Sequence, residues 1–206
     1  MRGPRVHMSH PPNQFDEAIR LIDAANAEDP HTAVGDDGRP TPAELIYGRR
    51  MSRWLAALYP SAGEALRLAA RGQHIRRWMI PRDSYPIDRA GYHRWRTSLY
   101  SFHADEMEKI LRAVGYGDEI VSRVRSLLRK ERLKADPESQ ALEDTVCLVF
   151  LENYFADFAP KHDDEKVINI LRRTWAKMSP VGHAAALKLD LSERPKALIS
   201  MALNKN

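Results

Sequence analysis

Three places along the chain carry side chains of the kinds that bind metals or transfer protons. His74 follows an apolar segment, His103 and Glu106 stand three residues apart, and Asp144 follows Glu143 directly before an apolar run. Residues three apart share one face of a helix. Imidazoles and carboxylates that converge hold divalent metals, and a neighbouring carboxylate can transfer a proton. We therefore take His74, His103 and Asp144 as metal-ligand candidates, and Glu106 and Glu143 as catalytic candidates.

Each of these residues also has a structural explanation. His74 can be a hydrogen-bonded histidine at a helix end, and His103 and Glu106 can both be solvated. A carboxylate on a buried helix, as predicted for Asp144, needs a cation or hydrogen-bond donors around it, because burying an unpaired charge is costly. An arginine and a metal are equally good partners, and the sequence leaves both open.

Arginines are interleaved with aromatic residues between positions 71 and 96. Arginine pairs with phosphate through two hydrogen bonds, and aromatic faces can stack on a base. The alternative is a network of arginines and carboxylates around core tryptophans. Glu28 and Asp29 lie on a loop that can close over the site or serve only the turn. The candidates for phosphate or substrate binding are Arg50, Arg76, Arg77, Arg82, Arg96, Trp78 and Trp95.

The apolar spacing is helical almost everywhere, and no segment has a convincing strand pattern. Residues 26–40 and 81–86 are expected to be irregular, and residues 129–137 form a basic connection. Thr41 and Ser61 are expected helix caps, and Gly115 an expected helix stop. The sequence predicts an all-α, single helical bundle over residues 15–206, preceded by a flexible arm, residues 1–14. The expected helices are 16–25, 41–59, 61 to about 78, 88–114, 119–128, 139–158, 165–178, 181–188 and 192–203.

Composition narrows the class of protein. Among 206 residues, 43% are hydrophobic and 29% charged, the balance of a globular domain that buries a core. The only cysteine, Cys147, excludes an internal disulfide and a cysteine-rich zinc site. No segment approaches the roughly 20 apolar residues of a membrane span, so we expect a cytoplasmic protein with no membrane partner. The net charge of +4 permits phosphate or nucleic acid as a partner.

The order of these segments resembles the histidine–aspartate (HD) superfamily, whose helical domains hold one or two divalent metals against a phosphoester. The resemblance implies an HD-like fold and a divalent metal (Mn, Fe, Zn, Ni or Mg). Tyr47 stands where the first histidine would be, and Gln73 and His74 stand in the histidine and aspartate places. The matching strings are Tyr47-Gly-Arg-Arg-Met51, Leu68-Ala-Ala-Arg-Gly-Gln-His-Ile75, Phe102-His-Ala-Asp-Glu-Met107 and Leu142-Glu-Asp-Thr-Val-Cys-Leu148.

More narrowly, nearly the whole chain is similar to the family called domain of unknown function 4202. That family brings no established activity. The resemblance is carried by Asn26-Ala-Glu-Asp-Pro30, Leu45-Ile-Tyr-Gly-Arg-Arg-Met51, Gln73-His-Ile-Arg-Arg-Trp78, Pro81-Arg-Asp-Ser-Tyr-Pro86, Tyr92-His-Arg-Trp-Arg96 and Leu142-Glu-Asp144.

Three functions are compatible with these residues. The first is a metal-dependent phosphohydrolase acting on a small phosphorylated or nucleotide-like substrate. The second is a non-catalytic phosphate- or nucleotide-binding module that has lost the metal, favoured by the missing His-Asp pair. The third is an RNA-binding protein that uses the basic residues 71–96 together with 123–134, although no recognised RNA-binding motif is present.

Overall fold

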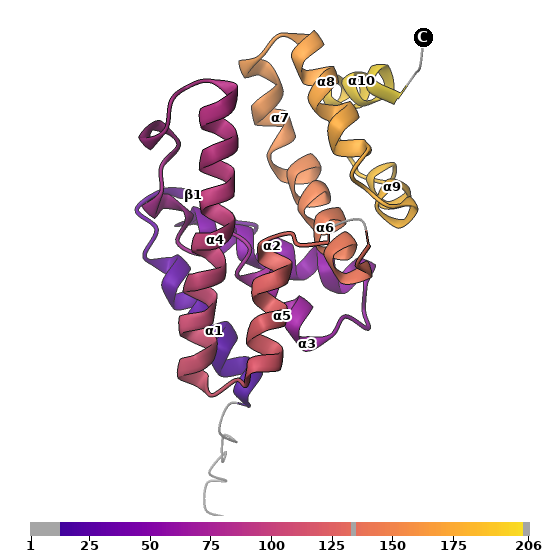
Figure 1. The fold of residues 1–206 in the computed structure, drawn as a ribbon. Helices are drawn as coiled ribbons and strands as arrows, with labels where there is room; N and C mark the ends of the chain where they lie inside the picture. The colour runs from indigo at the N-terminus through magenta and orange to yellow at the C-terminus, as the bar shows by residue number, and fades with distance from the viewer. Residues whose placement is uncertain (1–12, 133–134, 204–206) are drawn as a thin grey trace, which may run out of the picture.

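The computed structural model describes residues 13–132 and 135–203 and confirms the all-α prediction (Figure 1). The predicted arm lies outside the described residues up to Pro12, and Gln14 already begins the first helix. The helices are α1 (Gln14–Ala27), α2 (Ala43–Leu58), α3 (Glu64–Arg71), α4 (Arg89–Val114), α5 (Asp118–Leu128), α6 (Pro137–Asn153), α7 (Phe155–Phe158), α8 (Asp164–Trp175), α9 (Pro180–Ala186) and α10 (Glu193–Leu203). Three short 3-10 helices are η1 (Arg77–Met79), η2 (Arg82–Ser84) and η3 (Ala159–Lys161).

The expectation of no strand is wrong at one place. Strands β1 (Thr32–Val34) and β2 (Pro40–Pro42) pair antiparallel in the segment predicted to be a loop. The hairpin turns through Gly38, which has a φ of 78°, a conformation that glycine adopts without strain. All three residues of β1 are exposed, and the strand is shorter than the roughly four to eight residues over which alternation indicates a strand.

The ends of α4 follow the local chemistry of the sequence. The side chain of Asp88 accepts a hydrogen bond from the Gly91 backbone N–H at 2.5 Å, which caps the first turn. At the other end Gly115 has a φ of 93°, and this left-handed residue stops the helix. The predicted helix 88–114 is therefore confirmed within one residue.

Helix α2 begins in a different way from the prediction. Thr41 belongs to β2, and Pro42 stands before the first helical residue without a side-chain cap. The buried carboxylate of Asp29 replaces it, because its Oδ2 accepts from the Glu44 backbone N–H at 3.1 Å. The cap of this helix therefore comes from 15 residues upstream.

Two predicted helices are shorter than expected. Helix α3 begins at Glu64, after Gly63 rather than a Ser61 cap, and it ends at Arg71. A series of turns then leads to Arg76, whose φ of 50° is left-handed and incompatible with a continuous helix. The predicted helix 139–158 is interrupted at Tyr154, which separates α6 from α7.

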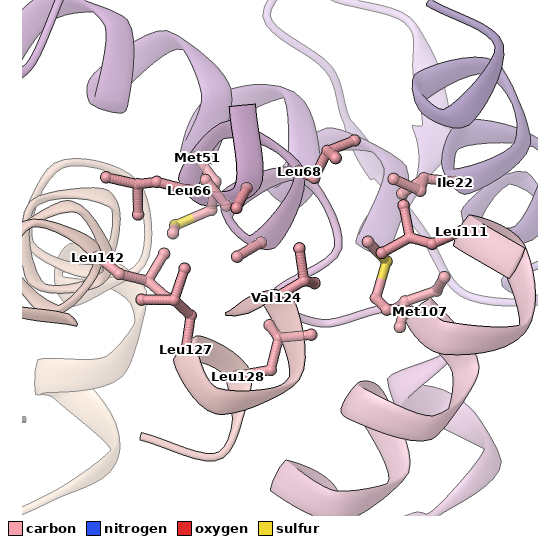
Figure 2. Close-up of a cluster of buried hydrophobic side chains, with 14 of the residues drawn as sticks. Ile22, Met51, Leu66, Leu68, Met107, Leu111, Val124, Leu127, Leu128 and Leu142 are labelled. Atoms are coloured by element: carbon pink, nitrogen blue, oxygen red, sulfur yellow. The ribbon is translucent and has the colours of Figure 1, made fainter. Parts of the chain in front are cut away.

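Two apolar clusters share helix α6. Figure 2 shows part of the first, where Met51, Leu66, Val124, Leu127 and Leu142 meet from α2, α3, α5 and α6. The second cluster joins α6 to α7, α8, α9 and α10 through Leu148, Phe155, Val167, Leu171 and Leu198 among others. Because α6 packs on both sides, it buries polar residues along with apolar ones, including Glu143 and Asp144.

Among residues 13–132 and 135–203, no helix is both long and apolar enough to cross a membrane.

Candidate functional site

His74 lies in the turn between α3 and η1, at the centre of the candidate site. Its ring stacks on Tyr47 of α2, with centroids 3.8 Å apart and planes 8° from parallel. Arg77 donates from Nη1 to Nε2 of His74 at 3.0 Å. Because arginine has only donors, Nε2 must be the unprotonated nitrogen. The proton then lies on Nδ1, which faces the Glu44 carboxylate at 3.3 Å.

Positive charges surround this imidazole. Burial lowers the pKa of His74 well below its ordinary value, and the charges of Arg77, Lys130 and Arg96 lower it further. The three cations come from separate elements, η1, the turn after α5, and α4. The result is a neutral histidine inside a cationic site.

Glu44 is the acidic partner in this site, and the sequence did not single it out as a functional residue. Its side chain is 16% exposed. Burial raises its pKa to about 7, and the Asp29 carboxylate raises it as well, while Arg77 and His31 act against the shift. The nearest cation is weakly placed, with Arg77 Nε 4.0 Å from Oε1. No local pattern distinguishes Glu44 from an ordinary acid in the first turn of a helix, because its environment depends on a contact thirty residues away.

His103 of α4 is the second histidine of the site, and its ring centroid lies 6.0 Å from that of His74. Its Nδ1 lies 2.8 Å from the Ile75 carbonyl oxygen. A carbonyl only accepts, so Nδ1 carries the proton and Nε2 has a lone pair. In the described part of the chain this buried Nε2 has no hydrogen-bond partner. Burial and the neighbouring His74 lower the pKa of His103 well below its ordinary value.

Asp144 does not have the charged partner that the sequence suggested. Its carboxylate accepts from the Tyr59 hydroxyl at 2.6 Å, from the Ser179 backbone N–H at 2.7 Å and hydroxyl at 2.5 Å, and from the Gln140 amide at 3.1 Å. Neutral donors therefore satisfy this fully buried carboxylate. Of the partners that the sequence allowed, the structure shows hydrogen-bond donors: Tyr59 at the end of α2, Ser179 at the start of α9, and Gln140.

The two catalytic candidates are both paired with cations. Glu143 contacts Lys130, and its Oε1 lies 3.7 Å from Lys177 Nζ. Burial acts to raise the pKa of Glu143, but these lysines outweigh it and the pKa is lowered. Glu106 contacts Lys109, and its Oε2 lies 3.8 Å from Arg76 Nε. Both carboxylates already have the counterions that a buried charge requires.

The described residues do not fit the predicted metal. They contain no group of three His, Cys, Asp or Glu side chains that could hold an ion. Arg77 occupies the lone pair of His74, and four hydrogen bonds fill the oxygens of Asp144. His74 and His103 come together as predicted, but Asp144 does not complete a ligand set with them.

The five candidate arginines contact carboxylates, aromatic rings or both. Arg50 and Arg76 pair with carboxylates, Arg50 with Asp36 at 2.8 Å and Arg76 with Glu28 at 3.0 Å. Arg77, Arg82 and Arg96 lie over aromatic rings. Arg50 also lies over the Tyr154 ring, and Arg77 has the Glu44 carboxylate at 4.0 Å. Of the two candidate tryptophans, Trp95 is buried under Arg77 and donates its indole N–H to the Ile80 carbonyl at 2.9 Å, and Trp78 is half-buried in η1.

Arg96 has no carboxylate in direct contact among the described residues, and the charge of Glu143 acts on it only at longer range. It is half-buried on α4, and its guanidinium donates to the Tyr100 hydroxyl at 2.6 Å. Within the described ranges, no carboxylate lies within 4 Å of Arg96 in an ion pair, in contrast to Arg50 and Arg76.

The segment Asn26–Pro30 supports the site, and sequence reasoning missed the part played by Asn26. Its buried side-chain oxygen accepts from the Arg76 backbone N–H at 3.1 Å and so holds the left-handed turn that presents His74. Asp29 caps α2 beside Glu44, and Glu28 pairs with Arg76. Asparagine between helix and turn is common, so only the tertiary contact distinguishes Asn26.

Comparison with known proteins gives a family without an assigned activity. A family model described as "Domain of unknown function (DUF4202)" matches residues 16–199. Neither the curated proteins nor the solved structures contain a match to the chain.

Proposed function

The chain belongs to this family of unknown function, and from the site itself we propose that Arg77, Arg96 and Lys130 bind the phosphate group of a small molecule beside the neutral imidazole of His74. This is the phosphate-binding module among the functions that the sequence suggests. It requires neither a metal nor the missing His-Asp pair.

The observation that carries the proposal is the half-buried guanidinium of Arg96, which has an aromatic hydroxyl but no carboxylate as its partner. A charge removed from water is stabilised by an opposite charge. An anionic ligand provides that charge. Arginine also offers phosphate two parallel hydrogen bonds, which a surface lysine cannot.

The neutral state of His74 suits such a ligand. An imidazole whose pKa is held low carries no proton on Nε2 at neutral pH. If a phosphate draws Arg77 towards itself, the freed Nε2 becomes an acceptor for a hydroxyl or amine of the same molecule. The ligand we propose is therefore a phosphate ester that carries a hydrogen-bond donor.

Charge pairing favours a small ligand over RNA. Several arginines of the second basic segment that an RNA-binding surface would use are paired with carboxylates. Arg123 contacts Asp136 and Glu138, and Arg125 contacts Glu108 and Asp105. RNA binding would show a steep fall of affinity with salt over many phosphate contacts, and a shallow salt dependence is expected instead.

Calorimetric titration with inorganic phosphate and with a nucleoside monophosphate tests the proposal. Arg96→Met should weaken binding at least about tenfold, because it removes a charge-assisted pair. The control is Arg94→Met, which removes an exposed arginine from the same helix and should leave the affinity within about twofold. Absence of binding to wild type, or equal losses in the two variants, would overturn the proposal.

The metal-dependent phosphohydrolase stays a prediction of the superfamily resemblance. The unpartnered Nε2 of His103 is the feature in its favour. Elemental analysis of purified wild type and His103→Ala checks it. Stoichiometric metal that is lost in the variant would favour the hydrolase, and wild type that stays metal-free after supplementation would leave the binding module.

A further inference from the structure

Cations and aromatic rings alternate beside the first half of α4. Tyr92, Arg96 and Tyr100 are spaced by four residues and so share one helix face. Each ring lies within cation–π distance of two positive groups. The distances from cation to ring centroid are Arg77–Trp95 4.8 Å, Arg82–Trp95 5.9 Å, Arg82–Tyr92 5.9 Å, Arg96–Tyr92 5.8 Å, Arg96–Tyr100 5.6 Å and Lys130–Tyr100 5.6 Å.

Arg82 is the outer member of this series. It shares the Trp95 ring with Arg77 and the Tyr92 ring with Arg96. The positive charges that depress the pKa of His74 are those of Arg77, Lys130 and Arg96, and Arg82 is not among them. Among the described residues Arg82 makes no direct contact with His74, whereas Arg77 donates to His74 Nε2 at 3.0 Å.

The guanidinium of Arg82 is held in place without being neutralised. It donates to the backbone carbonyls of Tyr85 at 3.0 Å and Pro86 at 2.8 Å. In the part of the chain that the structure describes, no carboxylate forms an ion pair with it. Backbone carbonyls fix the group but carry no net charge, and arginine stays protonated at all relevant pH values. A fixed guanidinium with its charge uncompensated is preorganised for an anion.

Two of the three inner cations, Arg77 and Lys130, differ from Arg82 in this respect. Arg77 has the Glu44 carboxylate at 4.0 Å, and Lys130 pairs with Glu143. Among the described residues, the cations of this series that form no ion pair are therefore Arg96, in the proposed site, and Arg82, beside it. A ligand with a single phosphate at His74 leaves the charge of Arg82 unmatched.

We propose that the ligand carries a second anionic group, bound by Arg82, so that the site takes a diphosphate or a bisphosphate rather than a monophosphate. The inference rests on the proposed function, since the first phosphate is the one held by Arg77, Arg96 and Lys130. The two anionic groups of the ligand would lie near the rings of Trp95 and Tyr92, over which the guanidinium groups are positioned.

Calorimetric titration of the full chain with inorganic phosphate and with pyrophosphate, at one ionic strength, tests the second group. Wild type should bind pyrophosphate at least about tenfold more tightly than phosphate. In Arg82→Met the affinity for phosphate should stay within about twofold, while the preference for pyrophosphate falls close to one. Arg94→Met should keep the wild-type preference, because that arginine is exposed elsewhere on α4.

A series of alkylene bisphosphonates of increasing length, titrated into wild type, needs no variant and guards against a loop disturbed by loss of Arg82. An affinity maximum at one spacing supports two fixed anion sites. Affinity that is indifferent to spacing, or phosphate bound as tightly as pyrophosphate, would overturn the second group and leave the first intact. Failure of both phosphate and pyrophosphate to bind wild type would overturn the proposed function as well.

Discussion

At the scale of single residues, the site combines a carboxylate and two imidazoles that are all shifted towards their neutral forms. Burial raises the pKa of Glu44 to about 7 and lowers those of His74 and His103. Folding therefore favours a protonated Glu44, and the stability it contributes is lost as the pH rises from about 4.5 through 7. The histidines act in the opposite sense, because their stability is present above about 6.5 and is lost as the pH falls below it.

The variant Glu44→Gln isolates the first of these effects. Glutamine keeps the shape and the hydrogen-bonding atoms but does not ionise. At pH 8 the free energy of unfolding should exceed that of wild type by about 1–3 kcal/mol, and near pH 4.5 the two proteins should be about equal. Urea denaturation at the two pH values measures this. The exposed Glu28 provides the control Glu28→Gln, and a stability difference for Glu44→Gln that is the same at both pH values would refute the explanation.

At the scale of elements, the turn after α3 decides where His74 and Arg77 lie. Arg76 has a φ of 50°, and the Asn26 side chain from the end of α1 accepts its N–H. A side chain in the left-handed region costs about 1–2 kcal/mol. The hydrogen bond to Asn26 stabilises this conformation, at a position where the local sequence alone predicts a continuing helix or a helix end. Strain of this kind gathers at functional sites.

Comparison of Arg76→Gly with Arg76→Ala measures that strain. Both variants lose the contacts of Arg76 with Glu28 and Glu106, so only the backbone distinguishes them. Glycine adopts the left-handed conformation without strain. The free energy of unfolding of Arg76→Gly should therefore exceed that of Arg76→Ala by about 0.5–1 kcal/mol, a difference that already includes the greater entropy of glycine in the unfolded chain. The same pair at Arg94, inside α4, should show the reverse order by about 1 kcal/mol. The same order at both positions would contradict the assignment.

At the scale of the whole molecule, α6 joins two apolar clusters, and Asp144 fastens that junction. Its carboxylate collects the hydroxyl of Tyr59 from the end of α2 and the backbone N–H and hydroxyl of Ser179 from the start of α9. Gly182 of α9 packs so closely that an added Cβ would lie 2.7 Å from Asp144 Oδ1. The residue therefore has a structural role that links the first cluster to the second.

Replacement of this carboxylate should cost stability rather than ligand affinity. Asp144→Ala leaves the buried donors without an acceptor and should lower the free energy of unfolding by about 3–5 kcal/mol. Asp144→Asn keeps one oxygen and should lose less. Denaturant unfolding measures both, and calorimetry at a temperature where the variant is folded should show phosphate affinity within about twofold of wild type. A decrease of less than about 1 kcal/mol in the free energy of unfolding of Asp144→Ala would contradict the structural role.

The sequence by itself determined most of the helices and the clustering of arginines and aromatic residues between positions 71 and 96. Helical periodicity and stops such as Gly115 act over a few residues, so they can be read locally. The predicted caps Thr41 and Ser61 were wrong, because Asp29 caps α2 and Gly63 precedes α3. The spacing of Tyr92, Trp95 and Arg96 likewise fixes a shared helix face before any packing is known.

Only the tertiary structure decided what the buried polar groups contact. Asp144 was predicted to be a metal ligand because two of its hydrogen-bond partners, Ser179 and Tyr59, lie 35 and 85 residues away in the sequence. Glu44 had no predicted role because its partner His74 lies in a distant turn. The sequence did not predict the hairpin of β1 and β2 or the hydrogen bond from Arg76 to Asn26 for the same reason. Charge and hydrogen-bond partners depend on which distant segments meet and how much water they exclude. Local residue spacing carries no record of either.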